Sequence, residues 1–205
     1  MSNPVHDLIS TRASASHLRP GTQVSRQVIE CVIALATRAP TSYNLQNWRF
    51  VIADTPAAKE KLRAVAYNQN KITDAAAVVI LIGTMPDPER LKLDLGRAVA
   101  AGLLPHGLDT AWAASVRAKY GDDPQASRDE AIRSASLAAA TLMIAAEAEG
   151  LATCPMIGFD AAGVAREFGL ASEEIPVMLV AIGKASEDSW PQKPRRAVSE
   201  VLSYA

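Results

Sequence analysis

Short apolar segments separated by longer helical stretches organise the chain. Residues 77–82 are continuously apolar and rich in β-branched side chains, which is typical of a strand covered on both faces. Residues 48–53, 152–156 and 177–182 predict further strands, with a short helix after Asp160. Because so few strands are separated by long helical stretches, we expect an α+β or α/β fold with a small sheet under helices.

Capping residues mark helices between these strands. Ser25 is a suitable N-cap for a helix that ends before Pro40. Thr55 and the proline after it favour a second helix, which runs to about Tyr67. A short helix is also predicted over residues 5–12. The first third of the chain is therefore expected to be mostly helical.

The most apolar helix is predicted in the second half of the chain. Residues 127–130 form a capping-box sequence at its start, and Gly150 closes it. Its alanine-rich sequence is apolar nearly all round, as expected for a buried central helix. Before it, residues 87–123 predict two helices, with a break at residues 102–107 and the second helix over residues 112–120.

Composition indicates one globular unit. The 205 residues are 49% hydrophobic and 21% charged, so we expect a single domain over residues 1–205. Residues 184–205 form a polar tail with little core of its own, and such an arm either frays or packs on a partner subunit. The net charge of −1 lacks the basic excess of a nucleic-acid binder, so we expect no nucleic-acid partner.

The sequence predicts no association with a membrane. The longest apolar run, residues 137–146, is far shorter than the roughly 20 residues that span a bilayer. The N-terminal residues lack the basic region and apolar run of a signal peptide. We therefore expect a soluble, cytoplasmic protein.

Residue patterns for self-contained catalysis are missing from the sequence. Cys31 and Cys154 lie far apart without a CxxC pattern, which excludes a disulfide framework or a structural zinc site. The histidines are scattered without HExxH spacing, and no GxGxxG, P-loop or GxSxG motif is present. We predict that both cysteines are small core residues, and we assign no catalytic side chain and no metal ligand. Any chemistry should then belong to a cofactor.

Four groups of polar residues remain that a globular core does not require. They are a donor-rich turn at residues 12–17, a hydroxyl and amide loop at residues 40–48, the pair Asn68 and Lys71, and a basic cluster at residues 193–196. Taken singly, each also fits a capping turn, a solvated loop or an exposed charge.

Together these segments resemble the motifs of the FMN-dependent nitroreductase family, in the family's order and over nearly the whole chain. The first two are Arg-Ala-Ser-Ala-Ser at residues 12–16 and Pro-Thr-Ser-Tyr-Asn-Leu-Gln-Asn-Trp at residues 40–48. The others are Asn-Gln-Asn-Lys at residues 68–71, Ala-Glu-Ala-Glu-Gly-Leu at residues 146–151 followed by Cys-Pro-Met-Ile-Gly-Phe-Asp at residues 154–160, and Gly183 ahead of Lys-Pro-Arg at residues 193–195.

The resemblance implies an α+β fold with a small mixed sheet flanked by helices and an extended C-terminal arm that packs on a partner subunit. It also implies a homodimer with the active site at the subunit interface, FMN as cofactor, and NADH or NADPH as electron donor. The cofactor-binding residues carried over to this chain are Arg12, Ser14, Ser16, Pro40, Thr41, Ser42, Asn44, Asn68, Lys71, Pro155, Met156, Ile157, Gly158, Lys193 and Arg195.

Each of these groups has an expected role in the implied site. Arg12, Ser14 and the basic tail residues suit the flavin phosphate, because they combine positive charge with directed donors. Lys71 with Asn68 is expected to stabilise the negative charge that hydride transfer places on the flavin's N1 and C2 carbonyl. Backbone N–H groups of residues 156–158 are expected to donate to its N5 and O4 edge, and the loop at residues 41–44 is expected to come from the other subunit.

This chain departs from the family pattern at two positions. Ser16 stands where the family usually has Arg or Lys, so one phosphate-side charge is missing. Either His17 or Arg196 compensates, or FMN binds more weakly. Ile157 stands where one subgroup has Glu, which makes the floor of the pocket more apolar.

The implied activity is ping-pong reduction of a nitroaromatic, a quinone or a similar electron-poor acceptor by NAD(P)H. Two alternatives stay open. The same scaffold could carry out a different flavin reaction, such as dehydrogenation or dehalogenation, or the protein could bind flavin without turnover. Trp112 and Tyr120 either stack on a planar acceptor or pack within their helix.

Overall fold

A computed structural model describes residues 3–205 and shows a four-stranded sheet in the order β1-β2-β4-β3. The strands are β1 (Trp48–Ala53), β2 (Ala77–Thr84), β3 (Ala152–Met156) and β4 (Glu174–Gly183). All three strand pairings are antiparallel. The expected mixed sheet is therefore corrected: within the described residues its parallel component is an isolated bridge between Ser14 and Thr153.

Helices cover both faces of the sheet because the strands are apolar on both faces. Val79 and Leu81 of β2 face α7 (Pro124–Ala148) and α2 (Arg26–Ala36). On the other face, Val78, Ile80 and Ile82 pack against α3 (Pro56–Ala64), α4 (Asn70–Asp74) and α8 (Ala161–Phe168). This alternation along β2 confirms the prediction of a strand buried on both sides.

Helix α7 is the long apolar helix expected from the sequence, but it begins earlier than predicted. Asp123 is its N-cap and accepts a hydrogen bond from the N–H of Ala126, with Pro124 in the first turn. Ser127 is instead buried inside the helix, where its hydroxyl donates to the carbonyl of Tyr120 at 2.9 Å. The capping-box assignment was wrong because a stronger start signal lies just upstream.

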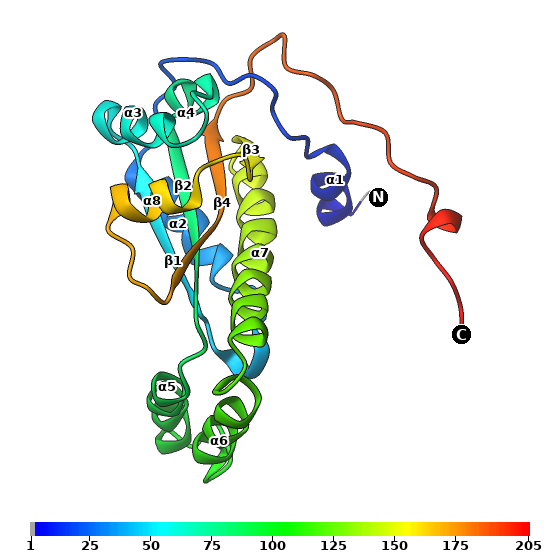
Figure 1. Ribbon diagram of the computed structural model, residues 1–205. Helices are drawn as coiled ribbons and strands as arrows, with labels where there is room; N and C mark the ends of the chain where they lie inside the picture. The colour runs from blue at the N-terminus through cyan, green and yellow to red at the C-terminus, as the bar shows by residue number, and fades with distance from the viewer. Residues whose placement is uncertain (1–2) are drawn as a thin grey trace.

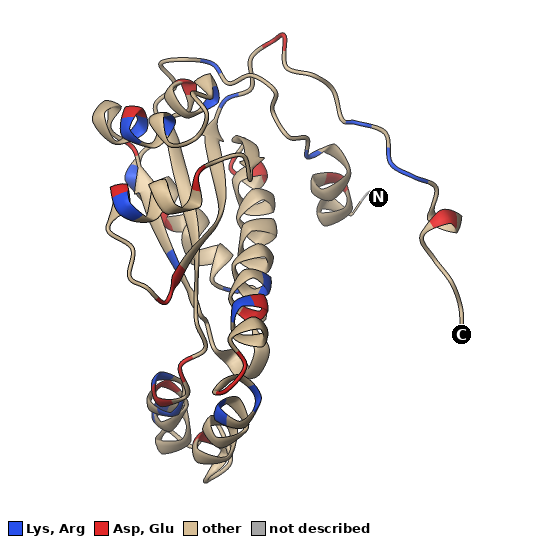
Figure 2. Cartoon of the chain, in the orientation of Figure 1, with Lys and Arg blue, Asp and Glu red and all other residues tan. Residues whose placement is uncertain are grey.

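Within residues 3–205, α7 is also the one helix long and apolar enough to cross a membrane by length and composition. Its charged residues gather toward its N-terminal half (Figure 2). Ala135, Ala138, Ala139 and Leu142 are buried in the core. The helix therefore contributes to the core of this fold.

The segment between β2 and α7 forms two helices, as predicted. They are α5 (Pro88–Ala100) and α6 (Leu108–Tyr120), and the break between them falls at the expected glycines and proline. Helix α6 begins four positions earlier than expected. Figure 1 shows both helices beyond the N-terminal end of α7, away from the sheet.

Two boundaries near the predicted site also differ. Helix α3 ends at Ala64 because Tyr67 and Asn68 adopt left-handed backbone conformations, with φ of 52° and 55°. The short helix α4 follows this turn and carries Lys71; the sequence pattern did not reveal it. At the ends of the chain, α1 (Pro4–Thr11), β4 and the exposed tail lie close to the predicted positions.

A close approach between β2 and α7 gives a test of this packing. A Cβ added to Gly83 would lie 2.5 Å from the carbonyl oxygen of Ala131, a backbone atom that cannot move aside. We expect Gly83→Ala to lower the free energy of unfolding by about 1–3 kcal/mol, measured by chemical denaturation.

Gly96 in α5 is the matched control, because a Cβ there meets only Asp109 Oδ2 at 3.7 Å. Gly96→Ala should leave stability unchanged or raise it by about 1 kcal/mol, since alanine favours helix. Equal effects of the two substitutions would contradict the close packing of α7 on β2.

Candidate functional site

A cavity of about 380 Å³ lies beside β3, near the C-terminal end of α7. The turn at residues 14–17, α4, β3 and the tail all contribute to its wall, so segments far apart in the sequence meet there. Of the predicted site residues, Ser14, Ser16, Lys71, Pro155 and Lys193 line it, together with Ala15, His17, Cys154 and Trp190. The structure therefore brings these five predicted residues together.

Pairing with the sheet edge positions the turn. Ser14 forms a parallel bridge with Thr153, and the N–H of Ala15 donates to the Thr153 carbonyl at 2.9 Å. Arg12 caps α1 through its backbone N–H, and its Nη1 atom is buried without a hydrogen-bond partner among residues 3–205. Arg12 is not among the residues that line the cavity, although it lies two positions before Ser14.

Lys71 extends from α4 toward β3. Its Nζ lies 3.7 Å from the Sγ of Cys154, which is buried and belongs to the hydrophobic core. The prediction that Cys154 is a core residue is confirmed, although its thiol also contacts the cationic group of the site. Sequence reasoning missed this contact because the two residues are 83 positions apart. The same prediction for Cys31 was wrong, because Cys31 lies exposed on α2.

The turn before α4 holds the segment that follows β3. Gln69 Nε2 donates to the carbonyl of Gly158 at 2.7 Å, a contact for which the sequence carried no signal. Asn68 is exposed and is not among the residues that line the cavity. Met156 is buried, whereas the Ile157 side chain is 77% exposed. Ile157 therefore presents its side chain outward.

The predicted loop residues lie elsewhere in the chain's fold. Pro40, Thr41 and Ser42 line a separate cavity of about 330 Å³ together with Lys119, Glu130, Arg133 and Leu137. Glu130 is near the start of α7, and β3 follows its other end. At 1.5 Å per residue, the part of α7 between Glu130 and the C-cap residue Glu149 is roughly 28 Å long. Within one chain, α7 therefore separates the loop from the cavity of Ser14 and Lys71.

The loop has an unusual backbone that its neighbours hold in place. Tyr43, Asn44 and Gln46 adopt left-handed conformations, with φ of 52°, 61° and 48°. Thr41 Oγ1 accepts a hydrogen bond from the N–H of Gln46 at 3.0 Å, and Tyr120 OH lies 3.3 Å from Ser42 Oγ. Such strain persists at positions that the surrounding structure over-determines, and it concentrates at functional sites.

A buried carboxylate anchors this arrangement. Glu130 is only 2% exposed, and it accepts hydrogen bonds from Tyr120 OH at 3.2 Å and from Ser134 Oγ at 2.9 Å. Arg133 pairs with the same carboxylate. The network satisfies the buried charge and connects it through Tyr120 to Ser42. Because Tyr120 is buried, the packing interpretation of this aromatic ring is the correct one; Trp112 packs edge-on against Tyr43 at 5.7 Å between ring centroids.

The basic tail residues divide into two groups. Lys193 reaches the cavity, with its Nζ 5.6 Å from the Trp190 ring centroid. Arg195 is exposed and donates to the carbonyl of Lys193 at 3.2 Å. Figure 2 shows these cations in blue along the tail, which runs away from the sheet.

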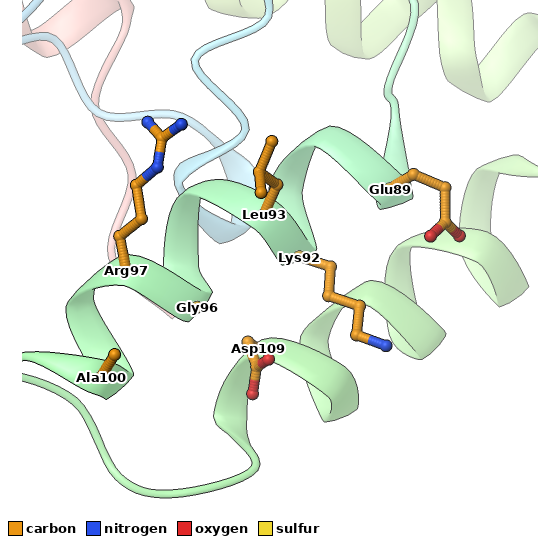
Figure 3. Close-up of a pocket in the computed structure, with 7 residues that line it drawn as sticks. All are labelled: Glu89, Lys92, Leu93, Gly96, Arg97, Ala100 and Asp109. Atoms are coloured by element: carbon orange, nitrogen blue, oxygen red, sulfur yellow. The ribbon is translucent and has the colours of Figure 1, made fainter.

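Another cavity, of about 480 Å³, lies between α5 and α6 and is lined by none of the predicted site residues (Figure 3). Its lining mixes both signs of charge: Lys92 and Arg97 with Glu89 and Asp109. Within residues 3–205, no group of three or more His, Cys, Asp or Glu side chains is arranged to hold a metal ion. The cation-lined cavity beside β3 is therefore the candidate site.

Comparisons with known proteins agree with the motifs and the fold. A family model described as the nitroreductase family matches residues 9–184, which include the turn, the loop, α4 and β3. The chain belongs to the nitroreductase family. It is an α+β member in which the cavity of Ser14 and Lys71 is built by the segments that carry the motifs.

Relatives in this family match the chain over nearly its full length. It is 32% identical over 198 residues to a Bacillus subtilis protein named as an NAD(P)H nitroreductase, YodC, covering 97% of each chain. The structure of the B. subtilis nitroreductase ydfN has a TM-score of 0.92 and 31% identity, over 98% of this chain and 99% of that one. An Exiguobacterium sibiricum nitroreductase solved in complex with FMN has a TM-score of 0.89 and 26% identity, over 100% and 99%.

The buried network below the loop can be tested by removing one donor. We expect Tyr120→Phe to lower the free energy of unfolding by about 1–3 kcal/mol, because the Glu130 carboxylate stays buried with one hydrogen bond fewer. Chemical denaturation measures the loss. Tyr67→Phe is the control, since Tyr67 is exposed; a Tyr120→Phe variant as stable as the control would contradict the network.

Proposed function

We propose that this protein is an FMN-dependent oxidoreductase that uses NAD(P)H to reduce nitroaromatics, quinones or similar electron-poor acceptors. Its membership of the nitroreductase family supports the reaction class, and the relative solved in complex with FMN supports the cofactor. One observation carries the proposal. Residues from four of the motif segments, at residues 12–16, 68–71, 154–160 and 193–195, meet in a cavity whose lining contains the cations Lys71 and Lys193.

The residues present fit FMN. No Asp or Glu is among the residues that line the cavity, and the buried Nη1 of Arg12 has no partner within residues 3–205. A phosphate oxygen would satisfy that nitrogen, with Ser14 supplying a hydroxyl and Lys193 a second charge. Arg12, Ser14 and the tail are therefore assigned to the phosphate.

Lys71 belongs to the other part of the proposed site. It stands on α4 beside β3, and Gln69 holds the neighbouring segment around Gly158 in place. A fixed cation there favours the electron-rich form of a bound ring system, because charge is stabilised strongly in a site sheltered from water. When bound, FMN supplies the redox chemistry by accepting a hydride from NAD(P)H and passing electrons to the acceptor. The protein then needs no acid or base for hydride transfer, which is consistent with the proposed ping-pong scheme.

The first test is spectroscopic. We expect the purified protein to bind FMN and its visible absorption to bleach when NADH or NADPH is added without oxygen. Lys71→Met should slow bleaching about tenfold or more, because a cationic donor is lost. Lys92→Met, which removes a lysine from the cavity between α5 and α6, is the matched control. A colourless protein that takes up no added FMN would refute the proposal, and FMN that binds but stays oxidised with both donors would indicate a flavin-binding protein without turnover.

The proposed site is completed by a second copy of the chain. The loop at residues 40–44 and the cavity of Lys71 lie at opposite ends of α7 in one protomer, so a partner's loop must approach this cavity if both contact one FMN. The tail supports a partner as well. Its apolar residues Val198, Val201, Leu202 and Tyr204 are exposed, and burying them favours packing on another subunit. We therefore include a homodimer with interfacial sites in the proposal.

Subunit mixing tests this arrangement. Lys71→Met damages the cavity, and Asn44→Asp places a negative charge on the loop while keeping a residue that tolerates the left-handed backbone. Each homodimer is expected to have both sites damaged. Mixed heterodimers carry both defects in one site and leave the other intact, so activity should recover to about a quarter of the wild-type level. Heterodimers seen by native mass spectrometry without any recovery would show that each site comes from one chain.

The proposal also includes the cellular compartment in which the protein acts. Cys31 and Cys154 are free thiols, which fits a reducing compartment. NAD(P)H is available in the same compartment. We place the protein in the cytoplasm, acting on small aromatic or quinone acceptors rather than on nucleic acid or membranes.

A further inference from the structure

The first part of the tail runs antiparallel to the turn that carries the site residues. On its other edge, this turn pairs with β3 through Ser14 and Thr153. The turn is therefore held between the sheet and the tail. The pairing with the tail consists of an antiparallel bridge between Leu18 and Ala185, a hydrogen bond from Arg19 N–H to the Lys184 carbonyl at 2.8 Å, and one from Ser186 N–H to the His17 carbonyl at 3.1 Å.

Ser16 closes this pairing with both its backbone and its side chain. Its hydroxyl oxygen accepts a hydrogen bond from the N–H of Trp190 at 2.7 Å, and its own N–H donates to Ser189 Oγ at 3.0 Å. Ser16 is 8% exposed, so these bonds are largely shielded from water. The residue is committed to the tail by two short contacts across 173 and 174 positions.

The part of the tail that follows the contacts with Ser16 carries a cation of the site. Lys193 follows Trp190 by three positions, lines the same cavity as Ser14, and lies over the Trp190 ring. Gln192 Nε2 adds one more attachment, donating to the Arg12 carbonyl at 2.8 Å. Past Gln192, the hydrogen bonds of the described tail stay within the tail. His17 also contacts the tail, through its N–H to Ser189 Oγ at 3.4 Å and through its ring Nδ1, 3.6 Å from Asp188 Oδ2. The position of Lys193 therefore depends on the attachments at Ser16, His17 and Gln192.

We propose that Ser16 is a positioning residue that clamps the tail so that Lys193 stays at the phosphate end of the flavin site. The inference rests on the proposed FMN function. Position 16 carries no charge of its own, and its contacts with the tail keep the cation of Lys193 in place. This separates Ser16 from Arg12 and Ser14, which are assigned to the phosphate directly. It also favours Lys193 over Arg196, which is not among the residues that line the cavity.

The clamp itself is tested without cofactor. In the apo protein, amide hydrogen exchange should show Trp190 protected, because its N–H is bonded to the Ser16 hydroxyl. Ser16→Ala should remove that protection, while Ser115→Ala, a change at an exposed serine in α6, should leave it unchanged. Unprotected Trp190 in the wild type, or equal protection in Ser16→Ala, would overturn the clamp whatever the protein binds.

Flavin affinity tests what the clamp is for. Ser16→Ala is expected to weaken FMN binding about five- to tenfold, the effect of one hydrogen bond to a group that orders a charge. Riboflavin, which lacks the phosphate, should bind the variant and the wild type equally. Fluorescence titration gives both dissociation constants. An equal loss for the two flavins would mean a general structural defect and would overturn the proposal.

A double-mutant cycle assigns the effect to Lys193. If Ser16 acts through that lysine, Ser16→Ala should change FMN affinity little in a Lys193→Ala background. Additive losses would mean that Ser16 contacts the phosphate itself, which contradicts the clamp. Ser189→Ala breaks the pairing from the tail side and should reproduce the FMN-selective loss. A wild type that binds neither flavin would refute the proposed function and leave the amide-exchange result standing.

Discussion

The rigidity of helix α7 is the constraint on which the rest of the structure depends. It is a 25-residue helix, and its alanine-rich surface packs so closely on the sheet that the Ala131 backbone meets Gly83. A helix held in this way cannot bend to bring its two ends together. The loop with the strained backbone is fixed near its start, through Tyr120 and Glu130, and the cation-lined cavity is fixed beyond its end. Two parts of the proposed site are thus kept apart within each chain, and for this reason the proposal includes a second copy.

In this fold, pairing between backbone segments also determines where the charged side chains of the site lie. The turn at residues 14–19 lies between β3 and the tail, so three segments from different parts of the chain share one short ladder. Ser14 is positioned by the sheet, and Lys193 is positioned by the tail that Ser16 holds. Under the proposed function, the flavin phosphate would pair with the Arg12 nitrogen that has no partner within residues 3–205. The same reasoning connects the fold to phosphate binding in an FMN-dependent oxidoreductase.

Much of this could be read from the sequence because the informative signals were local. The apolar run in β2 and the alanine-rich run in α7 predicted a covered strand and a buried helix, and both are present. The motif around Lys71 predicted a cation ahead of β2, although the helix that carries it was missed because α4 is only five residues long. The sequence did not reveal the contact of Gln69 with Gly158 or that of Lys71 with Cys154, because each joins segments that are distant in the chain.

The sequence by itself determined the fold class, the family motifs and the chemical types of the site residues, because periodicity, caps and short motifs depend on neighbouring positions. Only the tertiary structure decided which of those residues share a cavity. It separated Pro40, Thr41 and Ser42 from Lys71, buried Tyr120 against Glu130, and committed Ser16 to the tail. These outcomes follow from long-range packing and strand pairing, in which residues separated by more than 170 positions meet at hydrogen-bond distance. No local sequence pattern predicts such a contact, because the free energy of the contact depends on how the whole core packs.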